Sequence, residues 1–285
     1  MPSKYEITYD TLPQPRQVRL DSTTVCNAKC PSCHKFQTKR KGEMSLDLIN
    51  EILKDVSRWN PPLDEIVPVN YGEFMLRPDW LQILKLISNK LPNTQLVLPM
   101  NGSMLDEQNV KSLCSILSLK IINFSLNAFF QETYEQFMGF QMATMANVDA
   151  AISMIKVLRP DIMLWVSMVF DPQYQSDLER DYFIEYWKQK GVIPWILAAS
   201  SCNRGLEIKI PRLEPCRSLF SDIVVGFDRK LGLCCFDAAF DAFDLGEYSG
   251  NLKEDWHKES VEAVRKIHNE YRRSEIPKCK NCSYA

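Results

Sequence analysis

Short apolar segments alternate with longer amphipathic segments along the first 200 residues of the chain. The apolar segments predict six strands, which are Gln17–Leu20, Glu65–Tyr71, Gln95–Pro99, Lys120–Leu126, Met163–Phe170 and Ile193–Ala198. The segments between them repeat apolar residues near i, i+3, i+4 and i+7, which predicts helices over Leu46–Trp59, Pro78–Lys90, Asp106–Leu117, Gln131–Met138, Met145–Leu158 and Gln175–Gly191. Such alternation is typical of parallel β-α units, so we expect an α/β fold with its reactive loops at the C-terminal ends of the strands.

The alternation ends after the sixth predicted strand. Two short apolar segments, Ile223–Phe227 and Leu231–Phe236, then flank a polar turn and predict a β-hairpin, and a helix is expected near Ser260–Arg272. The pattern therefore predicts two domains: a β/α domain over residues 1–205, and a smaller unit of a hairpin and a helix over residues 206–285.

The composition of the chain is that of an ordinary globular protein. It has 285 residues, of which 45% are hydrophobic and 25% charged, with a net charge of −2. The absence of a basic excess argues against nucleic acid or an anionic membrane as a partner. No segment approaches the about 18 consecutive apolar residues of a membrane span, and the N-terminal segment lacks the apolar run of a signal peptide. We therefore expect a cytoplasmic protein.

The ten cysteines are concentrated near the two ends of the chain. In a reducing cytoplasm, clustered cysteines bind metal more often than they form disulfides. The first group is Cys26, Cys30 and Cys33, and the second is Cys216, Cys234, Cys235, Cys279 and Cys282. Of the remaining two, Cys114 lies among leucines and is expected in the core, whereas Cys202 follows the sixth predicted strand. The sequence thus predicts two metal sites.

The first group has the spacing C-x3-C-x2-C and directly follows the first predicted strand. Three thiolates in one loop can hold three irons of a [4Fe–4S] cluster and leave the fourth iron without a protein ligand. That open iron is available to a substrate or cofactor, as in other catalytic metal sites. The alternative is a zinc knuckle, for which His34 would have to serve as fourth ligand although it is adjacent to Cys33.

This cysteine spacing after the first strand resembles the signature of the radical S-adenosylmethionine (SAM) superfamily, whose fold is a partial (β/α)6 barrel. The resemblance implies that SAM binds the open iron and is cleaved by an injected electron to a 5′-deoxyadenosyl radical, which abstracts a substrate hydrogen atom. It also implies a low-potential electron donor of the flavodoxin or ferredoxin type. One departure is Ser32, because the family usually has an aromatic residue before the last cysteine.

Polar residues at the ends of later strands resemble further motifs of this family. Tyr71-Gly72-Glu73 resembles its Gly-Glu element, in which a carboxylate and backbone acceptors suit the ammonium group of SAM. Met100-Asn101-Gly102 resembles its Thr-Asn-Gly element. By the same resemblance, the predicted SAM contacts are Gly72, Glu73, Asn101, Ser125, Asn127 and Ser167. An ordinary hydrogen bond at a strand end remains the alternative role for each of them.

Cys216, Cys234, Cys279 and Cys282 have the spacing C-x17-C-x44-C-x2-C, which would close either a [4Fe–4S] site or a Zn(Cys)4 site. The order of elements around them resembles the SPASM auxiliary-cluster domain or its shortened form, twitch. The spacing is similar to that of the 2-deoxy-scyllo-inosamine dehydrogenases of this family. The resemblance implies one auxiliary [4Fe–4S] cluster, and so two [4Fe–4S] clusters in all. Cys235 is the alternative to Cys234 as a ligand.

Three functions follow from these sites. The first is a two-electron oxidation of a small polyol, sugar or aminocyclitol, with the auxiliary cluster accepting an electron. The second is an epimerase of a sugar or peptide residue in which Cys202 gives a hydrogen atom to the substrate radical, and the third is a zinc scaffold without activity. Modification of ribosomal peptides is also open, but the 25 residues before Cys26 leave no room for a winged-helix leader-binding domain. We therefore expect a small-molecule dehydrogenase.

Overall fold

One mixed sheet organises the computed structural model, which describes residues 8–199, 214–280 and 282. Its strands are β1 (Gln17–Asp21), β2 (Glu65–Val67), β3 (Gln95–Met100), β4 (Leu119–Ser125), β5 (Met163–Phe170), β6 (Ile193–Ala198), β7 (Asp222–Gly226) and β8 (Leu231–Gly232). The order is β6-β5-β4-β3-β2-β1-β7-β8, and every neighbouring pair is parallel except β7 and β8. The predicted partial barrel is confirmed as β1 to β6 in sequential order.

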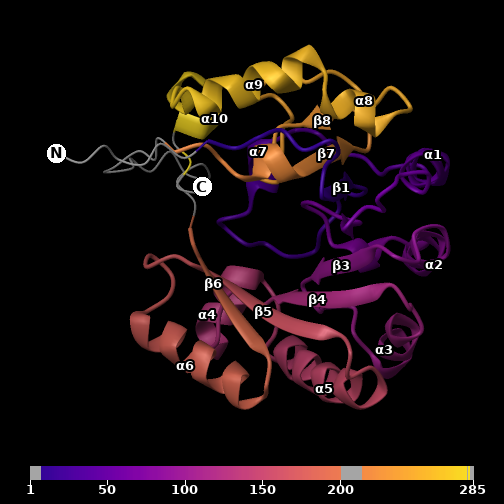
Figure 1. The fold of residues 1–285 in the computed structure, drawn as a ribbon. Coiled ribbons are helices and arrows are strands. Elements are labelled where there is room, and N and C mark those ends of the chain that lie inside the picture. The colour runs from indigo at the N-terminus through magenta and orange to yellow at the C-terminus, as the bar shows by residue number, and fades with distance from the viewer. Residues whose placement is uncertain (1–7, 200–213, 281, 283–285) are drawn as a thin grey trace.

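The helices cover the outer side of the sheet (Figure 1). Those of the β/α units are α1 (Leu46–Val56), α2 (Trp80–Lys90), α3 (Glu107–Cys114), α4 (Gln131–Met138), α5 (Ala143–Leu158) and α6 (Asp177–Gln189). Side chains of Ser45, Asp106 and Ser176 cap α1, α3 and α6 by accepting a hydrogen bond from the backbone N–H three residues on. These caps explain why the helices begin where they do.

The C-terminal section adds two strands and several short helices to the same sheet. Strand β7 pairs in parallel with β1 over its whole length, so this section is hydrogen-bonded to the first strand of the chain. Its helices are α7 (Ser218–Ser221), α8 (Leu252–Trp256), α9 (Glu259–Asn269) and α10 (Pro277–Lys280). In Figure 1 they lie beside β7 and β8, at the far end of the molecule from α5 and α6. The domain division at residue 205 stays a prediction.

The predicted hairpin strand Leu231–Phe236 is too long, because β8 ends at Gly232. Beyond it the chain turns, and the backbone N–H of Asp237 donates to the carbonyl of Cys234 at 3.1 Å. Cys234 and Cys235 therefore lie in a turn. The regular alternation of a strand, which requires extended backbone, therefore does not decide which of the two sulfurs is the ligand.

The two faces of the parallel strands differ in polarity. Along β4, Ile122 and Phe124 are fully buried in the core, whereas Asn123 and Ser125 point to the opposite, inner face. Ser125 lies beside Ser167 of β5 in the parallel register. Alternation with period two thus separates an apolar outer face, which packs under the helices, from a polar inner face.

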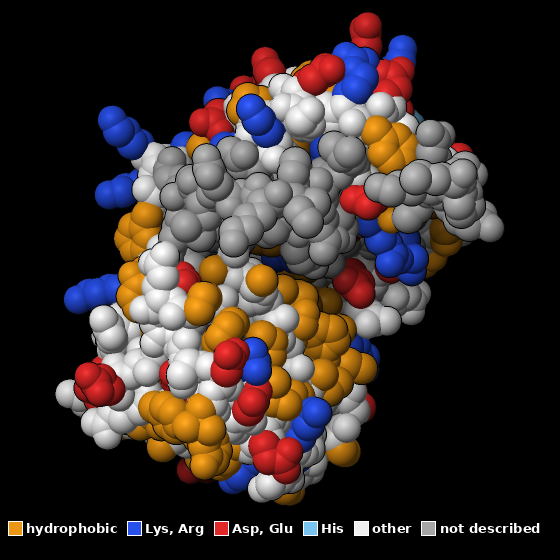
Figure 2. All heavy atoms as spheres, turned by 90° about the vertical axis from the view of Figure 1, so that its left-hand side faces the viewer, with side chains coloured by type: hydrophobic (Ala, Val, Ile, Leu, Met, Phe, Trp, Pro, Cys, Tyr) orange, Lys and Arg blue, Asp and Glu red, His pale blue; other side chains and the backbone are white. Residues whose placement is uncertain are grey.

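Apolar side chains gather on the exposed face around β6 and α6 (Figure 2). They include Phe130, Leu178, Tyr182, Ile193 and Trp195, each at least 38% exposed. Strand β6 is an edge of the sheet among the described residues, so the barrel does not close there. Among all the residues that the structure describes, no helix is long and apolar enough to cross a membrane.

Candidate active site and two cysteine groups

A chamber of about 720 Å³ lies on the inner face of the sheet, at the C-terminal ends of the strands. Cys26, Cys30 and Cys33 form part of its wall, together with residues from the segment after β2 and from β3 to β6. This volume is within the range of small-molecule sites. The structure therefore brings the first cysteine group to the one face of the sheet where loops from several strands meet.

Every SAM contact predicted from the sequence lines this chamber: Gly72, Glu73, Asn101, Ser125, Asn127 and Ser167. Gly72 is required by close packing, because a Cβ atom there would lie 2.2 Å from the carbonyl oxygen of Thr23. The chamber thus gathers three thiols with a carboxyl, two amides and two hydroxyls. This is the set of groups expected around an iron–sulfur cluster and a ligand that carries an ammonium and a ribose.

Glu73 is the buried acid of the chamber, with 3% of its surface exposed. Its Oε2 atom accepts a hydrogen bond from the backbone N–H of Asn101 at 2.6 Å, and Oε1 accepts one from that of Met75 at 3.2 Å. Burial raises the pKa of the Glu73 carboxyl to about 7, although the two N–H groups oppose this rise. A cationic ligand in the chamber would favour the ionised form.

Two asparagines contact the first cysteine group through their amides. Asn101 Nδ2 lies 3.9 Å from the sulfur of Cys26, and Asn127 Nδ2 lies 3.8 Å from that of Cys30. The Asn127 side-chain oxygen is already used, because it accepts a hydrogen bond from Val169 N at 3.0 Å. Donors aimed at sulfur stabilise the negative charge that a cluster ligand carries.

Lys35 is a contributor that the sequence prediction missed. Its ammonium donates to the carbonyls of Ala28 at 2.7 Å and Cys26 at 3.2 Å, which fixes the loop between the cysteines. Burial raises the pKa of the Cys30 thiol to about 12, and the charge of Lys35 acts in the opposite direction. The sequence could have indicated this role, because Lys35 follows Cys33 by two residues and a cation beside three thiolates lowers their charge repulsion.

The second cysteine group does not line the chamber. Its thiols lie near enough to one another to shift one another's pKa. Burial raises the pKa of the Cys234 thiol well above its usual value, and Cys235, Cys216 and Cys279 raise it further. Burial also raises the pKa of the Cys279 thiol to about 12, and Cys216 and Cys282 contribute to this rise. The thiols of all four predicted ligands and Cys235 are thus near enough to affect one another's ionisation, and Cys279 and Cys282 are buried.

A buried arginine accompanies this second group. Arg273 is 1% exposed, and it donates to the carbonyls of Glu214 at 3.1 Å and Cys282 at 3.3 Å. Its positive charge acts to lower the pKa of Cys216 and Cys279. Four thiolates around a metal or cluster carry excess negative charge, which a buried guanidinium would offset. No spacing rule in the sequence pointed to this residue.

Both groups have the donor chemistry that iron–sulfur clusters require, namely half-buried or buried thiols with a nearby cation and N–H donors, which in the second group include the backbone N–H of Phe236, 3.4 Å from the Cys234 sulfur. Among residues 8–199, 214–280 and 282, no three His, Cys, Asp or Glu side chains lie as close together as ligands of one metal ion. The residues present fit the clusters by their chemistry. Cys202 lies outside the described residues.

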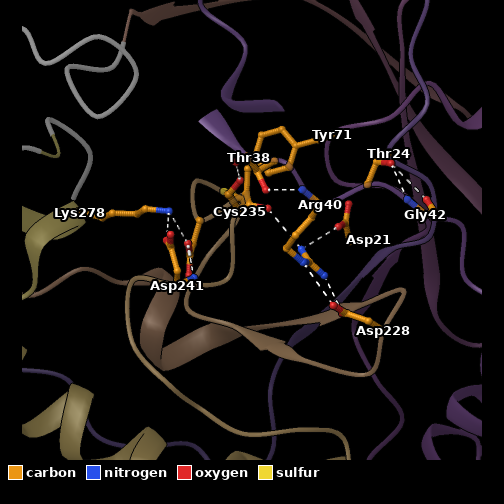
Figure 3. A network of polar contacts seen from close by, with 12 residues as sticks. Asp21, Thr24, Thr38, Arg40, Gly42, Tyr71, Asp228, Cys235, Asp241 and Lys278 are labelled. Atoms are coloured by element: carbon orange, nitrogen blue, oxygen red, sulfur yellow. Dashed lines mark hydrogen bonds and ion pairs between the residues drawn. The ribbon is translucent and has the colours of Figure 1, made fainter. Parts of the chain in front are cut away.

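Three aromatic rings form one wall of the chamber. The ring of His34 lies 5.7 Å from that of Tyr71 and 5.1 Å from that of Phe236, measured between centroids. All three rings line the chamber, while Phe236 directly follows Cys235. The hydroxyl of Tyr71 donates a hydrogen bond to the carbonyl of Cys235, as Figure 3 shows. The chamber therefore shares this wall with the second group.

Arg40 joins the loop of the first group to the C-terminal section (Figure 3). Its guanidinium lies 2.6 Å from Asp228 and 3.6 Å from buried Asp21, and it stacks 3.9 Å from the ring centroid of Phe240. Burial raises the pKa of Asp21 to about 6, against the attraction of Arg40. These contacts fix the orientation of the hairpin relative to the first cysteine loop.

Comparison with known proteins places this geometry in context. A family model described as the radical SAM superfamily matches residues 20–182. No curated protein sequence matches the chain.

Several solved structures share its fold. BtrN in complex with AdoMet and 2-DOIA has a TM-score of 0.70 at 17% identity, over 97% of this chain and 95% of that chain. Native anSMEcpe with bound AdoMet has a TM-score of 0.66 at 15% identity, over 88% of this chain and 83% of that chain. Streptococcus suis SuiB bound to precursor peptide SuiA has a TM-score of 0.61 at 11% identity, over 95% of this chain and 70% of that chain. At these identities the likeness shows the fold.

Proposed function

This chain belongs to the radical SAM superfamily, and from that premise we propose that it oxidises a small polyol, sugar or aminocyclitol by two electrons. Membership confirms the resemblance read from the first cysteine group, and implies SAM and a [4Fe–4S] cluster as cofactors. Together these cofactors supply the 5′-deoxyadenosyl radical that removes a hydrogen atom from the substrate. Cys26, Cys30 and Cys33 would hold the cluster.

The side chains of the chamber would orient SAM and protect the radical from water. Glu73 and the backbone around Gly72 would bind the ammonium of SAM, since the carboxyl is buried and already fixed by two N–H donors. Asn101 would act at the junction of cluster and SAM, because its amide contacts the Cys26 sulfur. Ser125 and Ser167, side by side on β4 and β5, would face the ribose or carboxylate.

One observation supports oxidation above the other outcomes: Tyr71, in the aromatic wall of the chamber, is hydrogen-bonded to Cys235 of the second cysteine group. After loss of a hydrogen atom, the carbon radical of an alcohol must lose one further electron and the hydroxyl proton to become a carbonyl. The electron would pass to an auxiliary [4Fe–4S] cluster held by Cys216, Cys234, Cys279 and Cys282, and the proton to water. The SPASM or twitch character of this section belongs to the same proposal.

The mass of the product in deuterated water tests this proposal. An oxidation gives a product lighter by two hydrogens, and Cys202→Ala keeps most of the activity. An epimerase gives a product that gains one solvent deuterium with its mass otherwise unchanged, and Cys202→Ala stops this gain. The second result would replace the dehydrogenase by an epimerase, since a thiol would then be returning a hydrogen atom.

The electron that cleaves SAM would come from a flavodoxin or ferredoxin. Cleavage of a sulfonium is a demanding reduction, so turnover should depend on such a donor or on a strong chemical reductant in its place. Formation of 5′-deoxyadenosine in air without any reductant would contradict the radical mechanism.

A further inference from the structure

Two side chains of the chamber lining carry buried polar atoms without a hydrogen-bond partner in the described part of the chain. These atoms are Nδ2 of Asn70 and Oδ1 of Asn123. They come from the segment after β2 and from the middle of β4. Buried polar atoms are nearly always paired in folded proteins, so two in one chamber call for an explanation.

Neither asparagine belongs to the set expected to bind SAM. Asn123 lies two residues before Ser125 on β4, and so about 7 Å further from the C-terminal end of the strand. The unpaired atoms of Asn70 and Asn123 are therefore available to a second ligand in the chamber.

The hydrogen-bonding character of these atoms is mixed. Asn70 offers a donor and Asn123 offers an acceptor. A hydroxyl group both donates and accepts, so a ligand with several hydroxyls could pair with both side chains. An apolar ligand would leave these atoms unpaired, which is unfavourable in a buried site.

The charge of the wall narrows the ligand further. Among the described residues that line the chamber there is no lysine or arginine, and the one carboxyl, Glu73, already accepts two backbone hydrogen bonds. Recognition of a phosphate or carboxylate normally uses such cations. The described wall is thus suited to hydroxyls and offers no side-chain cation to an anion.

We infer that Asn70 and Asn123 belong to the substrate subsite, and that its ligand is an uncharged, hydroxyl-rich small molecule such as a free cyclitol or sugar. Asn70 donates to one hydroxyl, and Asn123 accepts from another. This subsite rests on the proposed function, which it deepens by excluding phosphorylated and nucleotide-linked substrates.

Equilibrium binding tests the subsite without any turnover. The protein carries its clusters and SAM, no reductant is added, and the probes are myo-inositol, scyllo-inositol and glucose, each compared with its monophosphate. We expect at least one free probe to bind, and its monophosphate to bind at least about ten-fold more weakly, which is about 1.4 kcal/mol. Equal or tighter binding of the monophosphate, or no binding of any free probe, would overturn the inference.

Variants identify the side chains. Asn123→Leu and Asn70→Ala should each weaken binding of the free probe about ten-fold. Asn93→Ala, at an exposed asparagine, should leave this binding unchanged. Because Asn123→Leu removes an unpaired buried atom, its melting temperature should not fall. Unchanged affinity in both variants would refute the assignment. If Asn123→Leu does not fold, Asn70→Ala and the monophosphate comparison still decide.

Formation of 5′-deoxyadenosine, measured separately with reductant, keeps the two proposals distinct. Binding that depends on the asparagines, but without two-electron oxidation of any probe, would contradict the proposed function and leave the subsite standing. Two-electron oxidation of a probe whose affinity is the same in both asparagine variants would support the proposed function and refute the subsite.

Discussion

The hydroxyl of Tyr71 donates a hydrogen bond to the backbone carbonyl of Cys235, which lies 164 residues further along the chain. Tyr71 immediately precedes Gly72 and Glu73, and Cys235 adjoins the predicted ligand Cys234. One hydrogen bond therefore connects the strand end that would bind SAM with the turn that would bind the auxiliary cluster. Because Cys234 lies in that turn, the position of its sulfur depends on how the turn is held.

Replacing Tyr71 by Phe should disturb the second cysteine group while leaving the first intact. The carbonyl of Cys235 loses its partner, so we expect a loss of stability of about 1–3 kcal/mol. In a background with Cys26, Cys30 and Cys33 changed to Ala, the paramagnetic resonance spectrum of the auxiliary cluster should shift. Tyr182→Phe, at a ring that is 52% exposed, is the control. Identical spectra and melting temperatures would argue against the link.

Arg273→Met should cost the protein its auxiliary cluster. The variant removes a buried cation beside Cys216 and Cys279 together with its donation to the carbonyls of Glu214 and Cys282. Iron should fall from about eight to about four atoms per chain, the content of one cluster instead of two. Arg272→Met serves as the matched control, because Arg272 is the exposed neighbour. Full iron content in Arg273→Met would show that its charge is dispensable.

Changing Cys26, Cys30 and Cys33 together to Ala should leave about four irons and abolish SAM cleavage. The remaining iron would then belong to the second group. Metal analysis of this variant distinguishes the alternatives that the sequence left open. Zinc instead of iron at the remaining site would contradict the auxiliary-cluster proposal and remove the proposed electron acceptor.

The stabilisation of the protein by SAM should depend on pH through Glu73. Burial raises the pKa of this carboxyl from 4.5 to about 7, so without ligand its ionisation makes stability decline as the pH rises from 4.5 to 7. The ammonium of SAM pairs only with the ionised form, which predominates above pH 7. The increase in melting temperature caused by SAM should therefore be larger at pH 8 than at pH 6.

Glu73→Gln provides the comparison that isolates this carboxyl, because any titration of SAM itself is common to both proteins. We expect the variant to bind SAM more weakly and to show the same stabilisation at both pH values. A pH dependence as large as that of the wild type would mean that Glu73 does not pair with SAM.

The sequence alone determined the β/α part of the fold and the cysteines and several of the polar strand ends that line the chamber. Periodicity located β3 to β6 to within two residues, because burial of alternate or every third to fourth residue is a local property. Asn101, Ser125 and Ser167 could be predicted to meet because parallel strands end at one edge of a sheet. Spacing found the cysteines for a similar reason, since Cys26, Cys30 and Cys33 share one short loop.

Only the tertiary structure decided how the second cysteine group lies relative to the first. Nothing in the pattern of β7 says that it pairs with β1, yet that pairing puts Cys235 against Tyr71 and Arg40 against Asp228. Arg273, Asn70 and Asn123 escaped prediction for the same reason. Periodicity reports whether a side chain is buried, but which atoms face it depends on contacts between residues far apart in the chain.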